Sequence, residues 1–163
     1  MANQLLLLAA VLWVTGAVLG LGGALTLARL ALALGAATGV LAAIICLPNA
    51  SQAVALPGQL IAETVSFQIE PHGLWLMGFG LFPAGFACAL ASPSTEGRRG
   101  WLFGAGLSLL GALGVFGLQN GAALLIAWEA MSLGGAVMLL SDKLGQARGR
   151  TVLFMLALLE VGA

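Results

Sequence analysis

The sequence predicts an all-α membrane protein, a polytopic bundle of transmembrane helices. Of its 163 residues, 61% are hydrophobic and only 7% are charged, whereas a soluble domain carries about a quarter charged residues. So few polar groups cannot cover a globular surface. The apolar runs are long, rich in glycine and alanine, and lack the alternation of barrel strands, which favours helices. Six basic and six acidic residues leave no net charge, which speaks against nucleic acid as a partner.

Five apolar runs are long enough to cross a bilayer, which takes about 20 residues at helical rise. The predicted spans are residues 5–28, 30–47, 74–91, 101–118 and 121–140, followed by a partial sixth at 151–163. The sixth run is too short to cross the membrane. The sequence therefore suggests a fragment, a split subunit or the product of a truncated gene. Residues 1–163 are expected to form a single transmembrane domain.

Two local patterns lie around the third span. Residues 65–69, Val-Ser-Phe-Gln-Ile, alternate apolar and polar side chains, which predicts a strand outside the membrane. Pro83 lies inside the span, where proline removes a backbone donor and clashes with the preceding turn. We therefore expect a kink near Pro83.

No motif in the sequence indicates a resident cofactor, a metal or a self-contained active site. The chain has no Cys-x-x-Cys pair, no spaced set of histidines and cysteines, and no phosphate loop. Cys46 and Cys88 are expected near opposite membrane faces, too far apart for a disulfide. His72 is the only histidine, and we interpret it as an interfacial group rather than a ligand. We expect no cofactor.

All six basic residues fall in alternate loops, and so on one face of the membrane. They are Arg29, Arg98, Arg99, Lys143, Arg148 and Arg150. The other loops carry Glu63 and Glu70 but no basic residue. The positive-inside rule places the basic loops in the cytoplasm and the N-terminus outside. The predicted location is the cell (inner) membrane, with the lipid bilayer around the helices.

Glu129 is the one ionisable residue of the fifth predicted span and lies near its middle. A charged carboxylate there costs roughly 2.5–3.5 kcal/mol on insertion scales. It therefore needs a partner, a water-filled pocket or a bound proton. Ionisable residues inside a membrane commonly mark ion or proton pathways, so Glu129 is the candidate proton relay. The alternative is a neutral, hydrogen-bonded glutamate that only packs between helices.

Glu160 in the partial sixth span is a possible second protonatable group. Counted from the basic loop, its depth is similar to that of Glu129. Two carboxylates at one depth could share a proton. The alternative is that Glu160 lies at a frayed terminus without a fixed partner.

Two motifs carry a resemblance to a known family. The first is Trp-Glu-Ala-Met-Ser-Leu at 128–133, after the polar turn Gln119-Asn120, and the second is Phe-Gln-Ile-Glu-Pro at 67–71. They resemble the antiporter-like subunits of membrane oxidoreductases. These are the proton-pumping subunits of NADH:quinone oxidoreductase, the Mrp antiporters, and component B of hydrogenase-4 and formate hydrogenlyase, the most similar branch. The family has Asp in place of Gln119, and Leu-Ser-Ala in place of residues 72–74.

The resemblance covers the whole chain but only about the first third of a family member. It implies that Glu129 relays protons, or that the transported ion is sodium, and that other membrane subunits of a redox complex are the partners. Those partners would carry the electron chemistry. In the family this glutamate pairs with a lysine on a seventh helix, which this sequence does not contain. The alternatives are a structural membrane subunit or anchor, and a non-functional truncated remnant.

Overall fold

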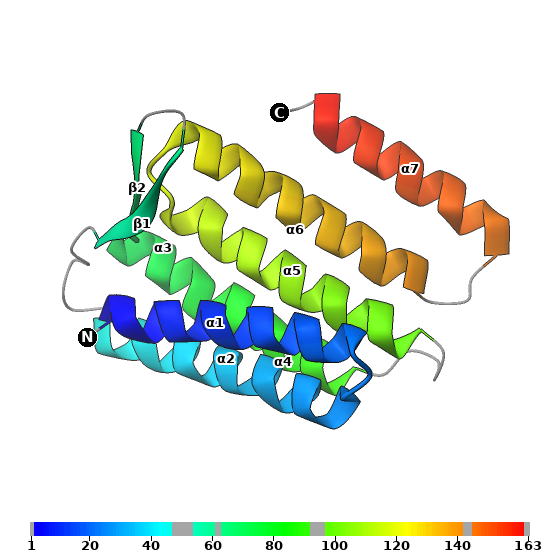
Figure 1. The fold of residues 1–163 in the computed structure, drawn as a ribbon, viewed down its shortest axis with the longest axis horizontal. Coiled ribbons are helices and arrows are strands. Elements are labelled where there is room, and N and C mark those ends of the chain that lie inside the picture. Colours follow the sequence, from blue (N-terminus) through cyan, green and yellow to red (C-terminus); the bar gives the residue numbers. More distant parts are fainter. Residues whose placement is uncertain (1, 47–53, 61–62, 92–96, 142–144, 162–163) are drawn as a thin grey trace.

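The computed structural model describes residues 2–46, 54–60, 63–91, 97–141 and 145–161, which form a helical bundle with a hairpin at one end (Figure 1). The helices are α1 (Ala2–Leu21), α2 (Leu25–Cys46), α3 (Pro71–Leu76), α4 (Phe82–Leu90), α5 (Arg98–Gly117), α6 (Gly121–Ser141) and α7 (Gly145–Val161), with a π-helical turn, η1 (Met77–Leu81), joining α3 to α4. The strands are β1 (Val54–Leu60) and β2 (Glu63–Phe67). The predicted fold class, a transmembrane helical bundle, is confirmed.

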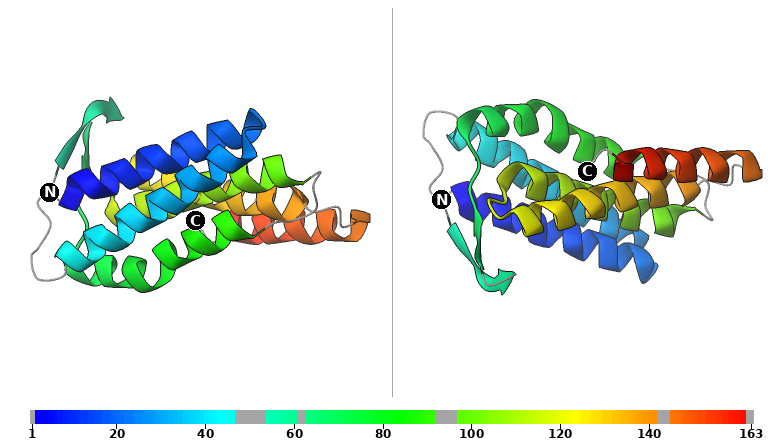
Figure 2. Two further views of the ribbon diagram at one scale, coloured as in Figure 1. Left: turned by 90° about the horizontal axis from the view of Figure 1, so that it is seen from below. Right: turned by 90° about the horizontal axis from the view of Figure 1, so that it is seen from above.

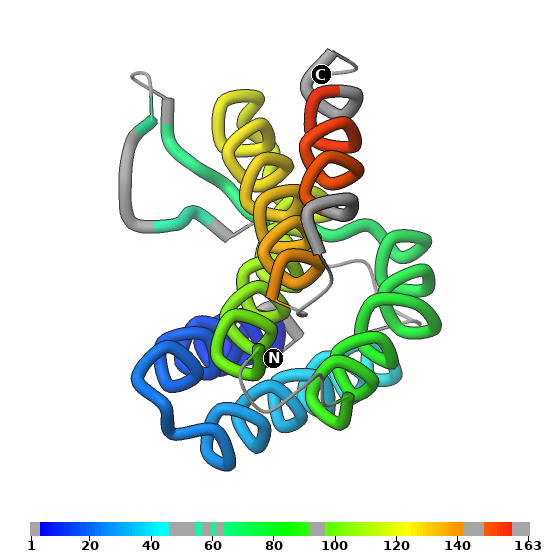
Figure 3. The backbone as a smooth tube through the Cα atoms, turned by 90° about the vertical axis from the view of Figure 1, so that its right-hand side faces the viewer, coloured from blue at the N-terminus to red at the C-terminus, as the bar shows by residue number. Residues whose placement is uncertain are grey.

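Among the described residues, five segments are long and apolar enough to cross a membrane. They are Gln4–Leu21, Leu25–Ile45, Pro71–Leu90, Arg98–Gly117 and Gly121–Ser141. Viewed along the bundle (Figure 3), α5 lies near the centre, with α1 and α2 on one side and α6 on the other, and α7 lies beside α6. The connections alternate between the two ends, so the α1–α2 turn, the start of α5 and the start of α7 share one end.

The first helix ends seven residues earlier than the sequence predicts. Gly23 has a φ of 85°, its N–H donates to Gly20 O (3.2 Å), and the Ala24 N–H donates to Leu19 O (3.0 Å). This is a Schellman cap, in which glycine adopts the left-handed conformation at no steric cost. Arg29, predicted to lie between two helices, therefore lies inside α2. Hydropathy does not reveal this turn, because glycines and apolar residues surround it.

The third span contains the irregularity expected near Pro83. It begins at Pro71 rather than residue 74, and a π-helical turn occupies Met77–Leu81. The Phe82 N–H donates to Met77 O, five residues earlier. A π-helical turn shifts the hydrogen-bond register just before proline, which has no N–H to donate. The axis of the segment bends at this place (Figure 2).

The ends of α5 and α6 lie within three residues of the predicted spans, but α7 begins six residues early. The predicted loop after the fifth span extends to Arg150, whereas α7 starts at Gly145. Its first turns are polar, so they carry no hydropathy signal. The predicted strand at 65–69 is confirmed at residues 65–67, which belong to β2, whereas residues 68 and 69 lie beyond its end. Strand β2 pairs with β1 in an antiparallel hairpin. The sequence reasoning missed β1, where Pro57 and Gly58 break the alternation.

The core between α1, α2 and α4 is built on two rings packed against glycines. Trp13 and Phe82 are fully buried, with ring centroids 6.1 Å apart. The Trp13 Nε1–H donates to Leu32 O (3.2 Å). A Cβ at Gly35 would lie 2.6 Å from Trp13 Nε1, and a Cβ at Gly39 would meet the Phe82 ring. Both rings therefore require helix faces without side chains, which brings the three helices together.

Candidate functional site

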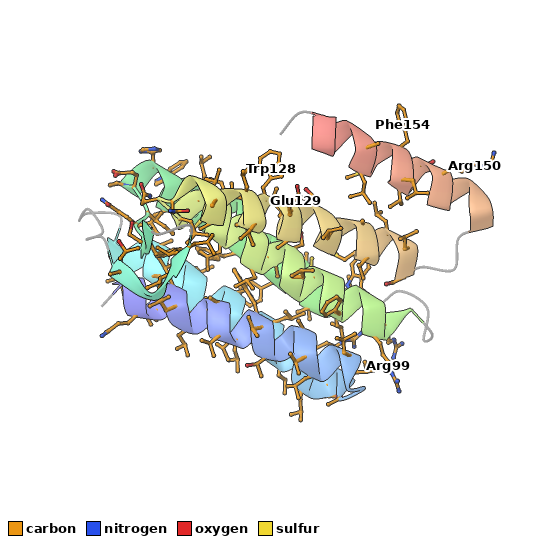
Figure 4. All side chains as sticks on the ribbon, turned by 45° about the horizontal axis from the view of Figure 1, so that its top comes forward. Arg99, Trp128, Glu129, Arg150 and Phe154 are labelled. Atoms are coloured by element: carbon orange, nitrogen blue, oxygen red, sulfur yellow. The ribbon has the colours of Figure 1, made fainter. Side chains whose placement is uncertain are left out.

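Glu129 lies on the side of α6 that faces away from α5. The backbones of these two helices touch: a Cβ at Gly111 would lie 2.6 Å from Ala127 O and would also meet Met131 N, and one at Gly104 would lie 2.6 Å from Gly134 O. Positions 127, 131 and 134 form one stripe on α6. Glu129 is two residues from 127 and 131, or about 200° around the axis. Figure 4 shows its side chain and that of Trp128 directed away from α5.

The side of α6 that carries Glu129 is covered by α7. Helix α6 packs chiefly against α5 and α7. Ser132 and Ala136 are buried, with 7% and 4% of their surface exposed, although both lie on the side away from α5. Helix α7 is the helix that packs on this side of α6. Glu129 lies one turn before Ser132 on this side and is half-buried. A carboxyl group here is shielded on one flank by a helix rather than surrounded by lipid.

The other predicted protonatable residue, Glu160, lies in α7, which runs antiparallel to α6 (Figure 1). Its side chain is not among those that the structure describes. The pairing of Glu129 with Glu160 through a shared proton therefore stays a prediction.

An apolar cavity lies between α1, α5, α6 and the hairpin, and it limits how water can reach Glu129. Its volume is about 360 Å³. Its lining contains apolar side chains and glycines, including Leu6, Phe67, Leu113 and Ala130. Apolar cavities stay dry because a water molecule needs two or more polar partners. This cavity therefore offers water no polar path toward Glu129.

The polar turn before α6 positions the helix that carries Glu129. Asn120 is 6% exposed, and its Oδ1 accepts a hydrogen bond from the Ala123 N–H (3.0 Å). Asparagine is one of the preferred N-cap residues. Sequence reasoning used Asn120 only as part of a motif. An Asn directly before a long apolar run was the signal that could have identified it as a cap.

Gln119 connects this turn to the hairpin. Its Nε2 donates to Gln68 O (3.0 Å) and Gly117 O (3.3 Å). Its backbone N–H donates to Ser66 O (3.0 Å), and the Gln68 N–H donates to Gly117 O (2.7 Å). The turn thus pairs with the end of β2 through an isolated antiparallel bridge between Phe67 and Leu118. These bonds fix the start of α6, and through it the depth of Glu129, relative to the hairpin.

The described basic residues Arg29, Arg98, Arg99 and Arg150 lie at the end of the bundle opposite the hairpin, which we call the basic end. Figure 4 shows Arg99 and Arg150 there. The guanidinium of Arg99 lies over the α1–α2 turn, with its Nη2 atom 3.1 Å from a Cβ built at Gly23. A cation is favourable at this place because the C-terminus of α1 carries a partial negative charge.

His72 is exposed at the hairpin end, one residue inside α3. No group of three or more His, Cys, Asp or Glu residues suited to a metal ion occurs in the part of the chain that was described. Cys88 is half-buried in α4 and free, and the side chain of Cys46 lies outside the described ones. These residues add no second candidate site to the one around Glu129.

The apolar composition and five membrane-length helices define a multi-pass helical membrane protein. No family model, curated protein or solved structure was found to match the sequence. The resemblance to antiporter-like subunits thus rests on the two motifs alone. In the structure, the first motif forms the middle of α6, and the second joins β2 to the start of α3.

Proposed function

We propose that the chain is the N-terminal part of a proton-translocating, antiporter-like subunit of a membrane-bound oxidoreductase, of the hydrogenase-4 or NADH dehydrogenase type, and that Glu129 relays the proton. The observation that supports this proposal is the place of Glu129. It is half-buried in the middle of a membrane-length helix, on the side covered by α7 and away from the dry cavity.

A glutamate in this position can be neutral or charged, depending on its surroundings. In an apolar environment the protonated form is favoured, because a charge there loses its hydration. A nearby positive charge favours the ionised form. Movement of charge in neighbouring subunits can therefore make Glu129 take up and release one proton per cycle. The chain itself needs only to hold the carboxyl group in place and to leave one side of it open to proton transfer.

The partners in this proposal are the other membrane subunits of a redox complex, which carry the electron chemistry. The protein lies in the cell (inner) membrane, with the basic end in the cytoplasm and the hairpin end outside. That orientation follows from the basic residues gathered at one end. The proposed ion is the proton; sodium is the other ion that the resemblance allows.

The test is the variant Glu129→Gln in the assembled complex. Glutamine keeps the shape of a protonated glutamate but cannot exchange a proton. Coupled proton movement should fall at least about tenfold, equivalent to about 1.4 kcal/mol in barrier height. Glu129→Asp should keep part of the activity, because the carboxyl group moves by one methylene. The matched control is Glu70→Gln, at an exposed residue of the hairpin end, which should leave proton movement unchanged.

The measurement is proton uptake into vesicles that contain the complex, with subunit content confirmed for each variant. A packing role predicts the opposite result for glutamine, since a neutral amide replaces a packed, protonated glutamate well. Full proton movement in Glu129→Gln complexes would rule out the relay and favour a structural subunit.

A further inference from the structure

Ser132 carries a buried hydroxyl group that has no hydrogen-bond partner among the residues that the structure describes. The residue is 7% exposed, and its Oγ makes no hydrogen bond within the described part of the chain. Leaving a buried hydroxyl unpaired is unfavourable, so each such group in a native protein calls for a reason, commonly an unseen water molecule.

Three other hydroxyl groups in the membrane-length helices behave differently. Thr15 Oγ1 donates to Val11 O (2.8 Å), Thr38 Oγ1 to Gly35 O (2.9 Å) and Ser141 Oγ to Val137 O (2.6 Å). Bonding to the carbonyl group three or four residues earlier is the usual way to satisfy such a side chain inside a helix. Ser132 does not use it, so its hydroxyl group remains available for a ligand outside the chain.

Ser132 lies three residues after Glu129 on the same helix, so the distance between the two positions is known. Residues three apart on a helix share a side, with Cβ atoms about 5–6 Å apart. One water molecule that makes two hydrogen bonds of about 2.8 Å bridges oxygen atoms up to about 5.6 Å apart, and the Ser132 hydroxyl and the flexible Glu129 carboxyl group can come within that distance. Both residues lie on the side of α6 that α7 covers, whereas the cavity on the other side is apolar. The arrangement therefore fits a single water molecule between the two side chains.

We propose that Ser132 holds a water molecule against the carboxyl group of Glu129, and that the proton passes between Glu129 and the basic end through this water. The proposal rests on the proposed relay function of Glu129. Helix α6 runs from the hairpin end to the basic end (Figure 1), so Ser132 lies on the basic-end side of Glu129.

In the release step, the carboxyl O–H bond of Glu129 breaks and its proton binds to the water oxygen. That water passes another of its protons to a solvent water molecule on the side of the basic end and is neutral again. Uptake follows the same steps in reverse. The Ser132 hydroxyl gains and loses no net proton. It is a positioning residue, because its hydrogen bond keeps the water oxygen next to the carboxyl group.

The experiment compares Ser132→Ala, Ser132→Thr and the control Ser141→Ala in the assembled complex. Ser141 lies on the same helix, but its hydroxyl is already bonded to Val137 O. Ser132→Ala should slow coupled proton movement roughly three- to tenfold, the effect of losing one ordinary hydrogen bond. Ser132→Thr keeps a hydroxyl group and should retain most of the rate, and Ser141→Ala should retain all of it.

The second readout is the infrared C=O stretch of protonated Glu129, identified by its loss in Glu129→Gln. Without the water, this band should move to higher frequency in Ser132→Ala and stay in place in Ser141→Ala. A band and a rate that are both unchanged in Ser132→Ala would overturn the bridging water. The relay itself would still stand if Glu129→Gln lost proton movement.

Two further outcomes separate the remaining explanations. If Glu129→Gln has no effect on proton movement, the proposed function fails, whereas a shifted band in Ser132→Ala would still support the water contact. If added sodium restores the rate of Ser132→Ala, the site between Ser132 and Glu129 holds a cation, and the assignment of water is overturned.

Discussion

Replacing Gly134 by alanine should push α5 and α6 apart, whereas the same change at the next residue should not. A Cβ at Gly134 would meet the backbone nitrogen of Ser108 and would lie 2.7 Å from Gly104 O, whereas ordinary contact begins at 3.4 Å. These are backbone atoms, which cannot turn away as the end of a side chain can. At Gly135 nothing lies within 4 Å. The two glycines therefore form a matched pair.

The expected difference in the free energy of unfolding between Gly134→Ala and Gly135→Ala follows from two contributions, helix propensity and overpacking. Alanine favours a helix over glycine by about 1 kcal/mol, and this gain is similar at the two positions. Only Gly134→Ala adds the overpacking cost, which is typically about 1–3 kcal/mol when the backbone has to shift. The shortfall of about 0.7 Å, from 2.7 to 3.4 Å, requires such a shift. We therefore expect Gly134→Ala to be less stable than Gly135→Ala by roughly 1–3 kcal/mol.

The free energies of unfolding can be measured by SDS titration of the purified chain in mixed micelles, followed by tryptophan fluorescence. Gly135→Ala should be equal to or more stable than the unchanged protein. A Gly134→Ala protein as stable as Gly135→Ala would refute the reasoning, because the backbones of α5 and α6 could then not be in contact. It would also remove the argument that directs Glu129 away from α5.

Two further predictions concern the basic end. Gly23→Ala should destabilise the protein by about 1–2 kcal/mol, the cost of the left-handed conformation for a residue with a Cβ, whereas Gly22→Ala, with its nearest atom at 3.6 Å, should be close to neutral in the same titration. The second prediction tests the orientation in a protein whose Cys46 and Cys88 have been replaced. A membrane-impermeant thiol reagent added outside whole cells should label Gly121→Cys and leave Gly22→Cys unlabelled. The reverse pattern would contradict the proposed orientation.

The sequence was sufficient for the class of protein and for the five membrane-length helices found among the described residues. Apolar runs of this length have few alternatives, because every backbone polar group inside a bilayer must be paired within its own segment. It also located Glu129 near the middle of a span, since depth follows from position along a helix. The positions of some helix ends were predicted wrongly. The glycine turn at Gly23 and the polar start of α7 at Gly145 carry no hydropathy signal, and both were misplaced.

The direction of Glu129 was decided only by the tertiary structure. A helix that is apolar all around, as α6 is, does not show which side packs against a neighbour. The choice is made by close approach of two backbones, where Gly104 and Gly111 of α5 meet Gly134 and Ala127 of α6. The burial of Ser132, whose hydroxyl has no partner among the described residues, is likewise visible only in the tertiary structure. The sequence by itself determined how deep the carboxyl group lies, whereas helix packing determined what it faces, because packing depends on contacts between residues far apart in the chain.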